Sequence, residues 1–309
     1  MCRLLGYASR NATTVREVLG LEESAVFQDM ARLHRDGWGS AWLTAGTGSP
    51  VADEHSGDEH SGDEHGGDEH GGEKLRADEP HSGLGAQRSP STGLGDDELT
   101  RLLVEDPATA RIVHLRMATS GMACSPENTH PFTVGNLSFA HNGALKPVGS
   151  LERHIDPRIR RQLAGTTDSE RYFAAIRSRM AVGAPMLEAV TSTVAALRED
   201  FPVASMNALL LSPTHLIAIH ASDGAPVPHD DFDASGMTDE QLPRHHREAY
   251  YLMRVRRLAH GAVVFASSGL DIGGWEPLPA ESVASVDLRT LEMSVHSLDG
   301  RSLDARRVA

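Results

Sequence analysis

Cys2 follows the initiator methionine directly, and this position gives it a chemistry that no other residue of the chain has. Removal of Met1 would leave a cysteine with both a thiol and a free α-amine. A thiol is already partly ionised at neutral pH and is strongly nucleophilic. The α-amine, with a pKa of about 7.7–8.0, can take up and return a proton near neutrality. Cys2 is therefore a candidate terminal nucleophile. The alternative is a small apolar residue that begins a buried strand.

Asn142 and Gly143 form a second candidate group. A nucleophile that attacks a carboxamide creates an oxyanion, which needs hydrogen-bond donors placed in advance. The side-chain amide of Asn142 and the backbone N–H of Gly143 could supply two such donors from one turn, because glycine permits a close backbone approach. The alternative is an ordinary Asn-Gly turn between two strands.

Three further residues could bind the head group of an amino-acid substrate. Arg116 ends an apolar segment, and a guanidinium can pair with a carboxylate through two hydrogen bonds. Thr119 can add a hydroxyl group, and Asp168 can bind an ammonium group. The alternatives are a surface arginine at 116 and a helix-capping aspartate at 168.

The elements that must position these residues alternate between strands and helices. Helices are expected at about 96–105, 168–180 and 185–198, the second one capped by Thr167 or Asp168. Consecutive strands around two adjacent helices favour stacked antiparallel sheets covered by helices. Short apolar or alternating segments predict strands at 3–8, 39–43, 111–116, 137–140, 204–212, 215–220, 262–267, 283–287 and 292–297. Residues 223–248 are polar and are expected to form a long loop.

A biased segment interrupts this pattern. Residues 53–72 are four tandem five-residue units, DEHSG, DEHSG, DEHGG and DEHGG, and glycine, serine and proline stay frequent to about Gly95. Such a composition cannot bury enough apolar surface to offset its ordering entropy. We expect one domain over 1–309 that contains a disordered insertion at 53–95. The repeated histidines could collect a metal ion weakly, but a solvated surface insertion is the favoured interpretation.

Composition excludes several function classes. Of the net charge of −14, fourteen acidic and three basic residues lie in 53–98, so the rest of the chain carries only −3. No basic stripe indicates a nucleic-acid surface. The two cysteines, Cys2 and Cys124, cannot form a disulfide framework. No apolar segment approaches the roughly 20 residues that span a bilayer, and no signal peptide is evident, so a cytoplasmic location is expected.

Together these motifs resemble the class II glutamine amidotransferases, in particular the stand-alone bacterial members. The resemblance lies in the cysteine after Met1, in Asp36-Gly37-Trp38-Gly39, in His114-Leu115-Arg116-Met117-Ala118-Thr119, in Glu127-Asn128-Thr129-His130-Pro131-Phe132, in Ala140-His141-Asn142-Gly143 and in Thr167-Asp168-Ser169-Glu170. It is strongest over 1–7, 34–43, 111–143 and 166–173. The His114–Thr119 motif departs from the family at Met117, where an aromatic residue is frequent. The residue after the motif, Ser120, is often a histidine in the family.

The resemblance implies an N-terminal nucleophile hydrolase fold, an α+β sandwich of four layers in which two antiparallel sheets lie between helices (αββα). It implies Cys2 as the nucleophile, with Asn142 and Gly143 as the oxyanion hole. It places Arg116 and Thr119 on the substrate α-carboxylate and Asp168 on the α-ammonium group. Three supporting residues complete the expected site: Trp38, Gly39 and His130, the first two close beneath the cysteine.

The expected activity is hydrolysis of the γ-amide of glutamine, or of a γ-glutamyl amide, through a thioester, with no cofactor and no metal. Glycine-rich phosphate loops are missing from the sequence, which leaves no evident acceptor site for ammonia. The chain could therefore feed ammonia to a separate synthase. It could also be a free-standing hydrolase, as the resemblance to the γ-glutamyl amidohydrolase of ergothioneine biosynthesis implies. The alternative of another class is a non-catalytic binding or scaffold protein on this fold.

Overall fold

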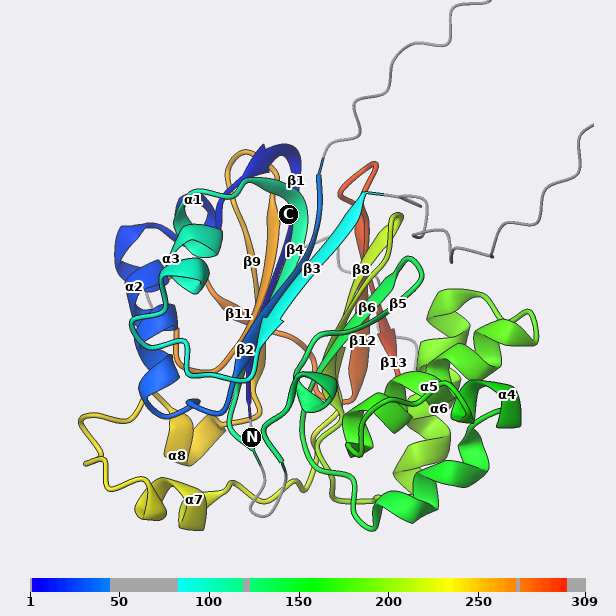
Figure 1. Ribbon diagram of the computed structural model, residues 1–309. Helices are drawn as coiled ribbons and strands as arrows, with labels where there is room; N and C mark the ends of the chain where they lie inside the picture. The colour runs from blue at the N-terminus through cyan, green and yellow to red at the C-terminus, as the bar shows by residue number, and fades with distance from the viewer. Residues whose placement is uncertain (1, 45–82, 119–122, 271–272, 299–309) are drawn as a thin grey trace, which may run out of the picture.

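Two antiparallel sheets stacked face to face form the centre of the computed structural model (Figure 1). The structure describes residues 2–44, 83–118, 123–270 and 273–298. In the seven-stranded sheet the order is β11-β9-β10-β1-β4-β2-β3, and in the six-stranded sheet it is β13-β12-β8-β7-β6-β5. Every strand pair in both sheets is antiparallel.

The strands of the first sheet include the one that carries Cys2 at its beginning. They are β1 (Cys2–Thr13), β2 (Trp38–Leu43), β3 (Leu84–Ser89), β4 (Ala108–Arg116), β9 (Met253–Arg257), β10 (Val263–Ser267) and β11 (Glu276–Pro277). The strands of the second sheet are β5 (Phe132–Val134), β6 (Leu137–Asn142), β7 (Asn207–Leu211), β8 (His215–His220), β12 (Ser282–Asp287) and β13 (Met293–Ser297).

Helices cover the outer face of each sheet, so the predicted four-layer α+β sandwich is confirmed (Figure 1). On the first sheet lie α1 (Val15–Leu19), α2 (Leu21–Asp29), the 3-10 turn η1 (Met30–Arg32) and α3 (Asp97–Val104). On the second lie η3 (Val148–His154), α4 (Pro157–Arg160), α5 (Asp168–Ala181) and α6 (Met186–Asp200). The remaining elements are η2 (Pro126–Asn128), α7 (His229–Ala234) and α8 (His246–Ala249).

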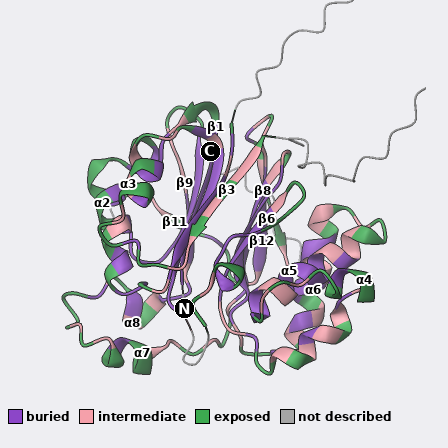
Figure 2. Cartoon of the chain, viewed as in Figure 1, coloured by how far each residue is buried: buried purple, intermediate pink, exposed green. Residues whose placement is uncertain are grey.

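Three apolar cores hold the four layers together, and Figure 2 shows buried residues along both sheets and on the inner sides of the helices. Strand side chains alternate between the two faces of a sheet. Leu4 and Ala8 of β1 therefore enter the core between the sheets, whereas Leu5 and Tyr7 pack against α1–α3. The third core lies between the second sheet and α5–α6.

Two helices, one on each sheet, begin at side-chain caps. Thr167 accepts a hydrogen bond from the backbone N–H of Glu170 at 3.1 Å and so caps α5. Asp168 is then the first helical residue, which leaves its carboxylate available for other contacts. Asp96 caps α3 by accepting from the N–H of Leu99 at 2.9 Å. Capping by such residues contributes about 1 kcal/mol.

The expected insertion at 53–95 is wrong at its C-terminal boundary, because Leu84–Ser89 forms β3 at the edge of the first sheet. β3 pairs with β2 from Leu43↔Leu84 to Trp38↔Ser89. An edge strand obtains its hydrogen bonds from one neighbour and needs only one buried face, so its polar composition was misleading. Gly85 fits here because a Cβ would come within 2.5 Å of the Trp42 ring. The DEHSG and DEHGG repeats lie outside the described residues.

The expectation of a plain loop over 223–248 is also wrong, since α7 and α8 lie within it. One fully buried residue anchors each short helix, Phe232 in α7 and His246 in α8. The aromatic rings of these two residues lie 5.8 Å apart. A single buried side chain in a polar segment gives no periodic signal, which is why composition predicted a loop.

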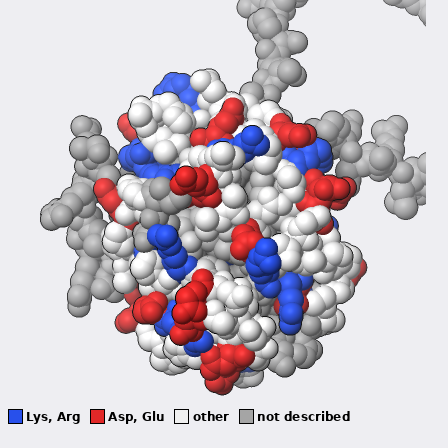
Figure 3. Space-filling view, turned by 90° about the vertical axis from the view of Figure 1, so that its left-hand side faces the viewer, with Lys and Arg blue, Asp and Glu red and all other residues white. Residues whose placement is uncertain are grey.

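Among the described residues no helix is both long and apolar enough to cross a bilayer. Figure 3 shows the side of the molecule that lies on the left in Figure 1. Basic and acidic side chains are interspersed over that face, so neither sign forms a continuous patch there.

Candidate active site

β1 and β4 bring the nucleophile candidate beside the carboxylate-binding candidate. Cys2 stands directly opposite Arg116 in the antiparallel register, and Leu4 stands opposite His114. Because strand side chains alternate between faces, Cys2, Arg116 and His114 share the face that looks toward the second sheet. The predicted juxtaposition of Cys2 and Arg116 thus follows from the pairing of two central strands.

The Cys2 thiol lies in an environment that favours its ionised form. Cys2 is 6% exposed, and its Sγ lies 4.0 Å from the carbonyl oxygen of Met117. Burial acts to raise the pKa of the thiol, but the charges of His114 and of the N-terminal ammonium group outweigh it. The pKa is lowered to about 5. A thiolate is the reactive form of cysteine, so this environment suits a nucleophile.

Asn142 bridges the two sheets at the thiol. Its Oδ1 accepts a hydrogen bond from the backbone N–H of Cys2 at 2.8 Å, although the two residues belong to different sheets. This bond fixes which end of the amide is the oxygen. The Nδ2 atom is buried and has no partner among the described residues. An unpaired buried donor is costly, and here it lies beside a nucleophile, where an oxyanion would satisfy it.

Gly143 is required where it stands. A Cβ on this residue would lie 1.9 Å from the carbonyl oxygen of Ser205, which is far closer than any side chain permits. Ser205 also donates from Oγ to the carbonyl oxygen of Asn142 at 2.7 Å. The close packing against Ser205 fixes the backbone of the Asn142-Gly143 turn, which begins where β6 ends.

Asp168 is connected to the same turn. Its Oδ2 accepts from the N–H of Leu145 at 2.6 Å, and its Oδ1 accepts from the N–H of Ser169 at 2.9 Å. The ring of His141 completes the connection by contacting Ser169 Oγ at 2.9 Å and the Ser205 carbonyl oxygen at 3.1 Å. The structure therefore joins Cys2, Asn142 and Asp168 in one hydrogen-bonded network through Ser205, His141 and Ser169.

Arg116 is a buried cation that the described part of the chain leaves without a carboxylate partner. It is 2% exposed. Its Nη1 donates to the carbonyl oxygen of Asp36 at 3.1 Å and to Cys124 Sγ at 3.3 Å, and its Nη2 contacts the carbonyl oxygen of Ala123 at 3.4 Å. A buried guanidinium with only neutral partners suits an anionic ligand. Thr119, the other predicted carboxylate-binding residue, lies outside the described residues.

Two positioning residues were not predicted. Asp36 accepts from the N–H of Ala118 at 2.7 Å and holds the chain just after Arg116. Asn128 donates to the carbonyl oxygen of Ala123 at 3.3 Å and accepts from the N–H of Thr166 at 2.9 Å, so it links the Arg116 segment to the start of α5. Both residues stand in motifs that the sequence made visible, but nothing in the sequence indicated their partners.

The three supporting candidates differ in their placement. Gly39 lies against the backbone of His130, since a Cβ would fall 2.2 Å from the His130 carbonyl oxygen. Trp38 does not lie beneath Cys2. Its side chain is buried on the opposite face of the sheet, where Nε1 donates to Asp96 at 3.0 Å. Successive strand residues point to opposite faces, so Trp38 and Gly39 could not both face the thiol.

His130 packs against His114, with ring centroids 4.2 Å apart. Burial lowers the pKa of His130 well below its usual range, and the charges of His114 and His141 act in the same direction. Neither ring nitrogen of His130 has a hydrogen-bond partner among the described residues. His130 is therefore a neutral ring behind His114. His114 itself was not proposed from the sequence, although its position two residues before Arg116 places both on one strand face.

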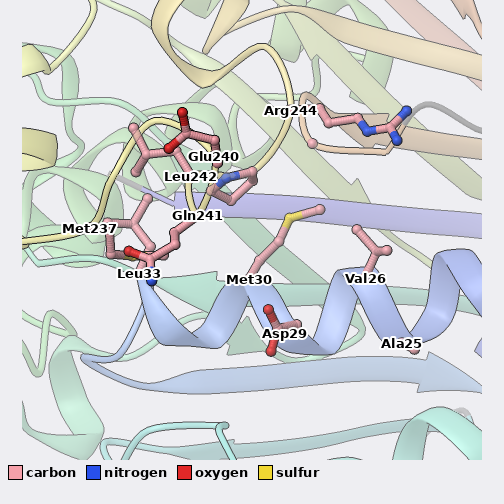
Figure 4. A pocket seen from close by; sticks show the side chains of 12 residues that line it. Ala25, Val26, Asp29, Met30, Leu33, Met237, Glu240, Gln241, Leu242 and Arg244 are labelled. Atoms are coloured by element: carbon pink, nitrogen blue, oxygen red, sulfur yellow. The ribbon is translucent and has the colours of Figure 1, made fainter.

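A groove of about 510 Å³ lies elsewhere, between α2 and the segment 237–244 (Figure 4). Met30 and Leu33 line one side of it, and Met237 and Leu242 line the other. None of the predicted site residues lines this groove, so the chemistry described above does not use it.

Known proteins resemble this chain in sequence and in fold. Residues 90–241 match the family model described as "Glutamine amidotransferases class-II". A glutamine–fructose-6-phosphate aminotransferase of Gluconobacter oxydans is 27% identical over 133 residues, which are 42% of this chain and 21% of that protein. A protein of Saccharomyces cerevisiae named "Probable glutamine amidotransferase" is 32% identical over 83 residues, 26% of this chain and 23% of that protein. The chain thus spans about a fifth of the length of these curated relatives.

A solved structure of a glutamine aminotransferase class-II domain protein from Silicibacter pomeroyi has the same fold. The TM-score is 0.56 at 15% identity, and the match covers 96% of this chain and 99% of that one. The matched family region contains Arg116, Asn142, Gly143 and Asp168. Residues 90–241 thus match the class II glutamine amidotransferase domain, and the chain shares its fold with a solved protein of this class.

Proposed function

We propose that the chain hydrolyses the γ-amide of glutamine, or of a γ-glutamyl amide, with Cys2 as the nucleophile after removal of Met1. The thiolate sulfur bonds to the γ-carbonyl carbon, and the carbonyl oxygen becomes an oxyanion. The C–N bond then breaks, and the nitrogen leaves as ammonia or an amine with a proton from the Cys2 α-ammonium group. Water attacks the thioester, the C–S bond breaks and glutamate is released.

Each side chain has a role that is set by the part of the substrate that it contacts. Asn142 Nδ2 and the Gly143 N–H stabilise the oxyanion. Arg116, and Thr119 by resemblance, bind the α-carboxylate, and Asp168 binds the α-ammonium group. The low pKa of Cys2 keeps the thiol ionised at neutral pH. The α-amine then needs only to hold the proton that the leaving nitrogen takes up.

The observation that carries this proposal is the orientation of the Asn142 amide. Because Oδ1 is bound to the N–H of Cys2, the unpaired Nδ2 is the atom left to face a substrate beside the thiol. A purely structural asparagine would have both ends of its amide satisfied. A scaffold protein on this fold has no evident reason to retain an orphan donor next to an ionised thiol.

Labelling tests the proposal directly. 6-Diazo-5-oxo-norleucine, a glutamine analogue, should label Cys2 stoichiometrically and leave Cys124 largely unlabelled, and the intact mass should show that Met1 is absent. Cys2→Ser should abolish most glutaminase activity while it keeps the fold. Glutamine should react, whereas acetamide, which lacks the amino-acid head group, should not. Retention of Met1 in fully active protein would contradict the terminal-nucleophile mechanism.

Two consequences for the setting of the reaction follow as part of the proposal. Ammonia released at Cys2 could pass to a separate synthase, since relatives of this chain are about five times as long as the matched region. A cytoplasmic location would keep the thiol reduced. No cofactor or metal is needed for the proposed steps.

A further inference from the structure

The Asn142-Gly143 turn, called the oxyanion turn below, is followed by residues 144–146. This short segment connects the candidate site to a separate pocket. Asn142 and Gly143 belong to the site, and the N–H of Leu145 binds Asp168 at 2.6 Å. The Leu145 side chain is buried in the core beneath α5 and α6. Its two neighbours in the chain, Ala144 and Lys146, line the pocket instead.

This pocket opens to the surface and has a volume of about 280 Å³. That volume is just below the range typical of small-ligand sites, roughly 300–1,000 Å³. Phe201, Val203 and Pro226 are among its apolar lining residues, and Ser205 and Tyr251 also line it. Released ammonia would not need such a volume.

Of the residues that line the pocket, Ser205 also contacts the Asn142-Gly143 turn. Ser205 packs against Gly143 and donates to the Asn142 carbonyl oxygen at 2.7 Å. The main chain of Tyr251 is held by Asn207, whose Nδ2 donates to its carbonyl oxygen at 2.5 Å. Burial raises the pKa of the Tyr251 phenol, Arg3 opposes the shift, and the Cys2 charge adds to it, which places Tyr251 within the field of the thiolate.

The charge of the pocket comes from Lys146. Asp200 also lines the pocket, but it is paired with Arg153 and with His154, the latter at 2.7 Å. Among the described acidic residues none lies within ion-pair distance of Lys146, which is exposed at the pocket rim. A ligand with an apolar body and a carboxylate would match this arrangement.

We propose that this pocket, lined by Lys146, Val203 and Tyr251, binds the amine half of a γ-glutamyl amide, and that this half is an apolar α-amino acid. The proposal rests on the hydrolase function proposed above and names the substrate class as γ-glutamyl dipeptides. The apolar side chain lies against Phe201 and Val203, and the carboxylate pairs with Lys146. The peptide nitrogen lies at the oxyanion turn, where the C–N bond breaks and the amino acid leaves with the proton from the Cys2 α-ammonium group.

Three substrates separate the contributions: L-γ-glutamyl-L-phenylalanine, γ-glutamyl phenethylamide, which lacks the carboxylate, and glutamine. We expect kcat/KM for the dipeptide to exceed that for glutamine about tenfold or more. Val203→Trp, which fills the pocket, should lower kcat/KM for both larger substrates about tenfold relative to glutamine. Lys146→Gln should lower the dipeptide value about two- to fivefold relative to the phenethylamide, as expected for an exposed ion pair.

Matched controls come from exposed residues that do not line the pocket. Val182→Trp and Arg158→Gln, both at exposed positions, should leave all three substrate ratios within about twofold of the wild type. The inference is overturned if glutamine is hydrolysed as well as the dipeptide. It is also overturned if Val203→Trp leaves the ratio of dipeptide to glutamine where it was.

Binding to an inactive protein distinguishes failure of the subsite from failure of the proposed reaction. Cys2→Ala protein should bind γ-glutamyl-phenylalanine in calorimetry, and Val203→Trp in that background should weaken binding about tenfold. If the wild type hydrolyses none of the three substrates but this weakening is seen, the reaction is wrong and the subsite stands. If binding is unaffected by Val203→Trp, the subsite is wrong whatever the activity.

Discussion

The backbone N–H of Cys2 donates to Asn142 Oδ1 at 2.8 Å, so the first residue of β1 is hydrogen-bonded to the last residue of β6 in the opposite sheet. This bond orients the side-chain amide so that Nδ2 is left without a partner among the described residues. In the proposed mechanism the two ends of the amide have separate roles, because Oδ1 holds Cys2 and Nδ2 stabilises the oxyanion.

Replacement of Asn142 should therefore act on turnover. An oxyanion exists only along the reaction path, so Asn142→Ala should lower kcat by roughly 10²–10³-fold and change KM little. Asn142→Asp is the informative partner variant, because it keeps an oxygen that accepts from Cys2 but has no N–H to donate. It should lose at least as much kcat as Asn142→Ala. Steady-state kinetics with glutamine measure both, and an effect confined to KM would show that Asn142 has another role.

The pH dependence of Cys2 reactivity should reflect its lowered pKa. The rate of alkylation by iodoacetamide should be half-maximal near pH 5 and constant above about pH 6. The Cys2 thiol is more acidic in the folded protein than in the unfolded chain, so its ionisation adds to the free energy of unfolding. This contribution is complete above the ordinary thiol pKa of about 8.5, and it is lost as the pH falls through about 5.

His114→Gln should raise the midpoint of the alkylation profile, because it removes a positive charge beside the thiolate. The control is His215→Gln at the far end of β8, which should leave the midpoint in place. An unchanged profile in His114→Gln would mean that His114 does not tune the thiol.

The head-group residues should act on substrate affinity. A charge-assisted pair contributes on the order of 1.5–3 kcal/mol, so Arg116→Ala should raise KM for glutamine about tenfold or more. Arg116→Lys keeps the charge but loses the two-pronged geometry, and it should recover only part of the affinity. Asp168→Asn should also raise KM. It should cost some kcat as well, because the carboxylate holds the N–H of Leu145 next to the oxyanion turn.

Two deletions should define the end of the dispensable insertion. A deletion of 53–82 leaves β2 and β3 intact, so glutaminase activity should stay within a few-fold of the wild type. A deletion of 53–95 removes β3 and exposes the edge of β2, which should lower the melting temperature by several degrees and reduce activity. Thermal unfolding monitored by circular dichroism compares the two. Equal stability of both proteins would show that β3 contributes nothing to the fold.

Regular periodicity and motif order carried the prediction of this fold. The expected helix at 168–180 corresponds to α5 (Asp168–Ala181), and the strand expected at 215–220 corresponds to β8 (His215–His220). β3 has only half-buried and exposed residues, and α7 has one buried residue, Phe232. Both were missed because they lie in polar, glycine-rich or acidic segments. Local composition does not show that a distant strand or core will supply the missing contacts.

The candidate site, like the fold, could be predicted only in part. Chemistry and spacing singled out Cys2, Arg116, Asn142 and Asp168, and the fold places all four near one another. The sequence could not indicate that Trp38 faces the helices, or that His114 faces the thiol, because that depends on the register of β2, β4 and β1. The contacts of Asp36 and Asn128 likewise depend on loops that meet only in the folded chain.

Because Cys2 and Asn142 come from different sheets, the thickness of the apolar layer between the sheets sets the distance between them. Small residues keep that layer thin, and a Cβ on Gly6 would already lie 3.0 Å from Leu209 in the opposite sheet. One added methyl group deep in this layer would change the reactive geometry without touching any site residue. The alanines that act as spacers in this layer are Ala8, Ala41, Ala110, Ala140, Ala218 and Ala284.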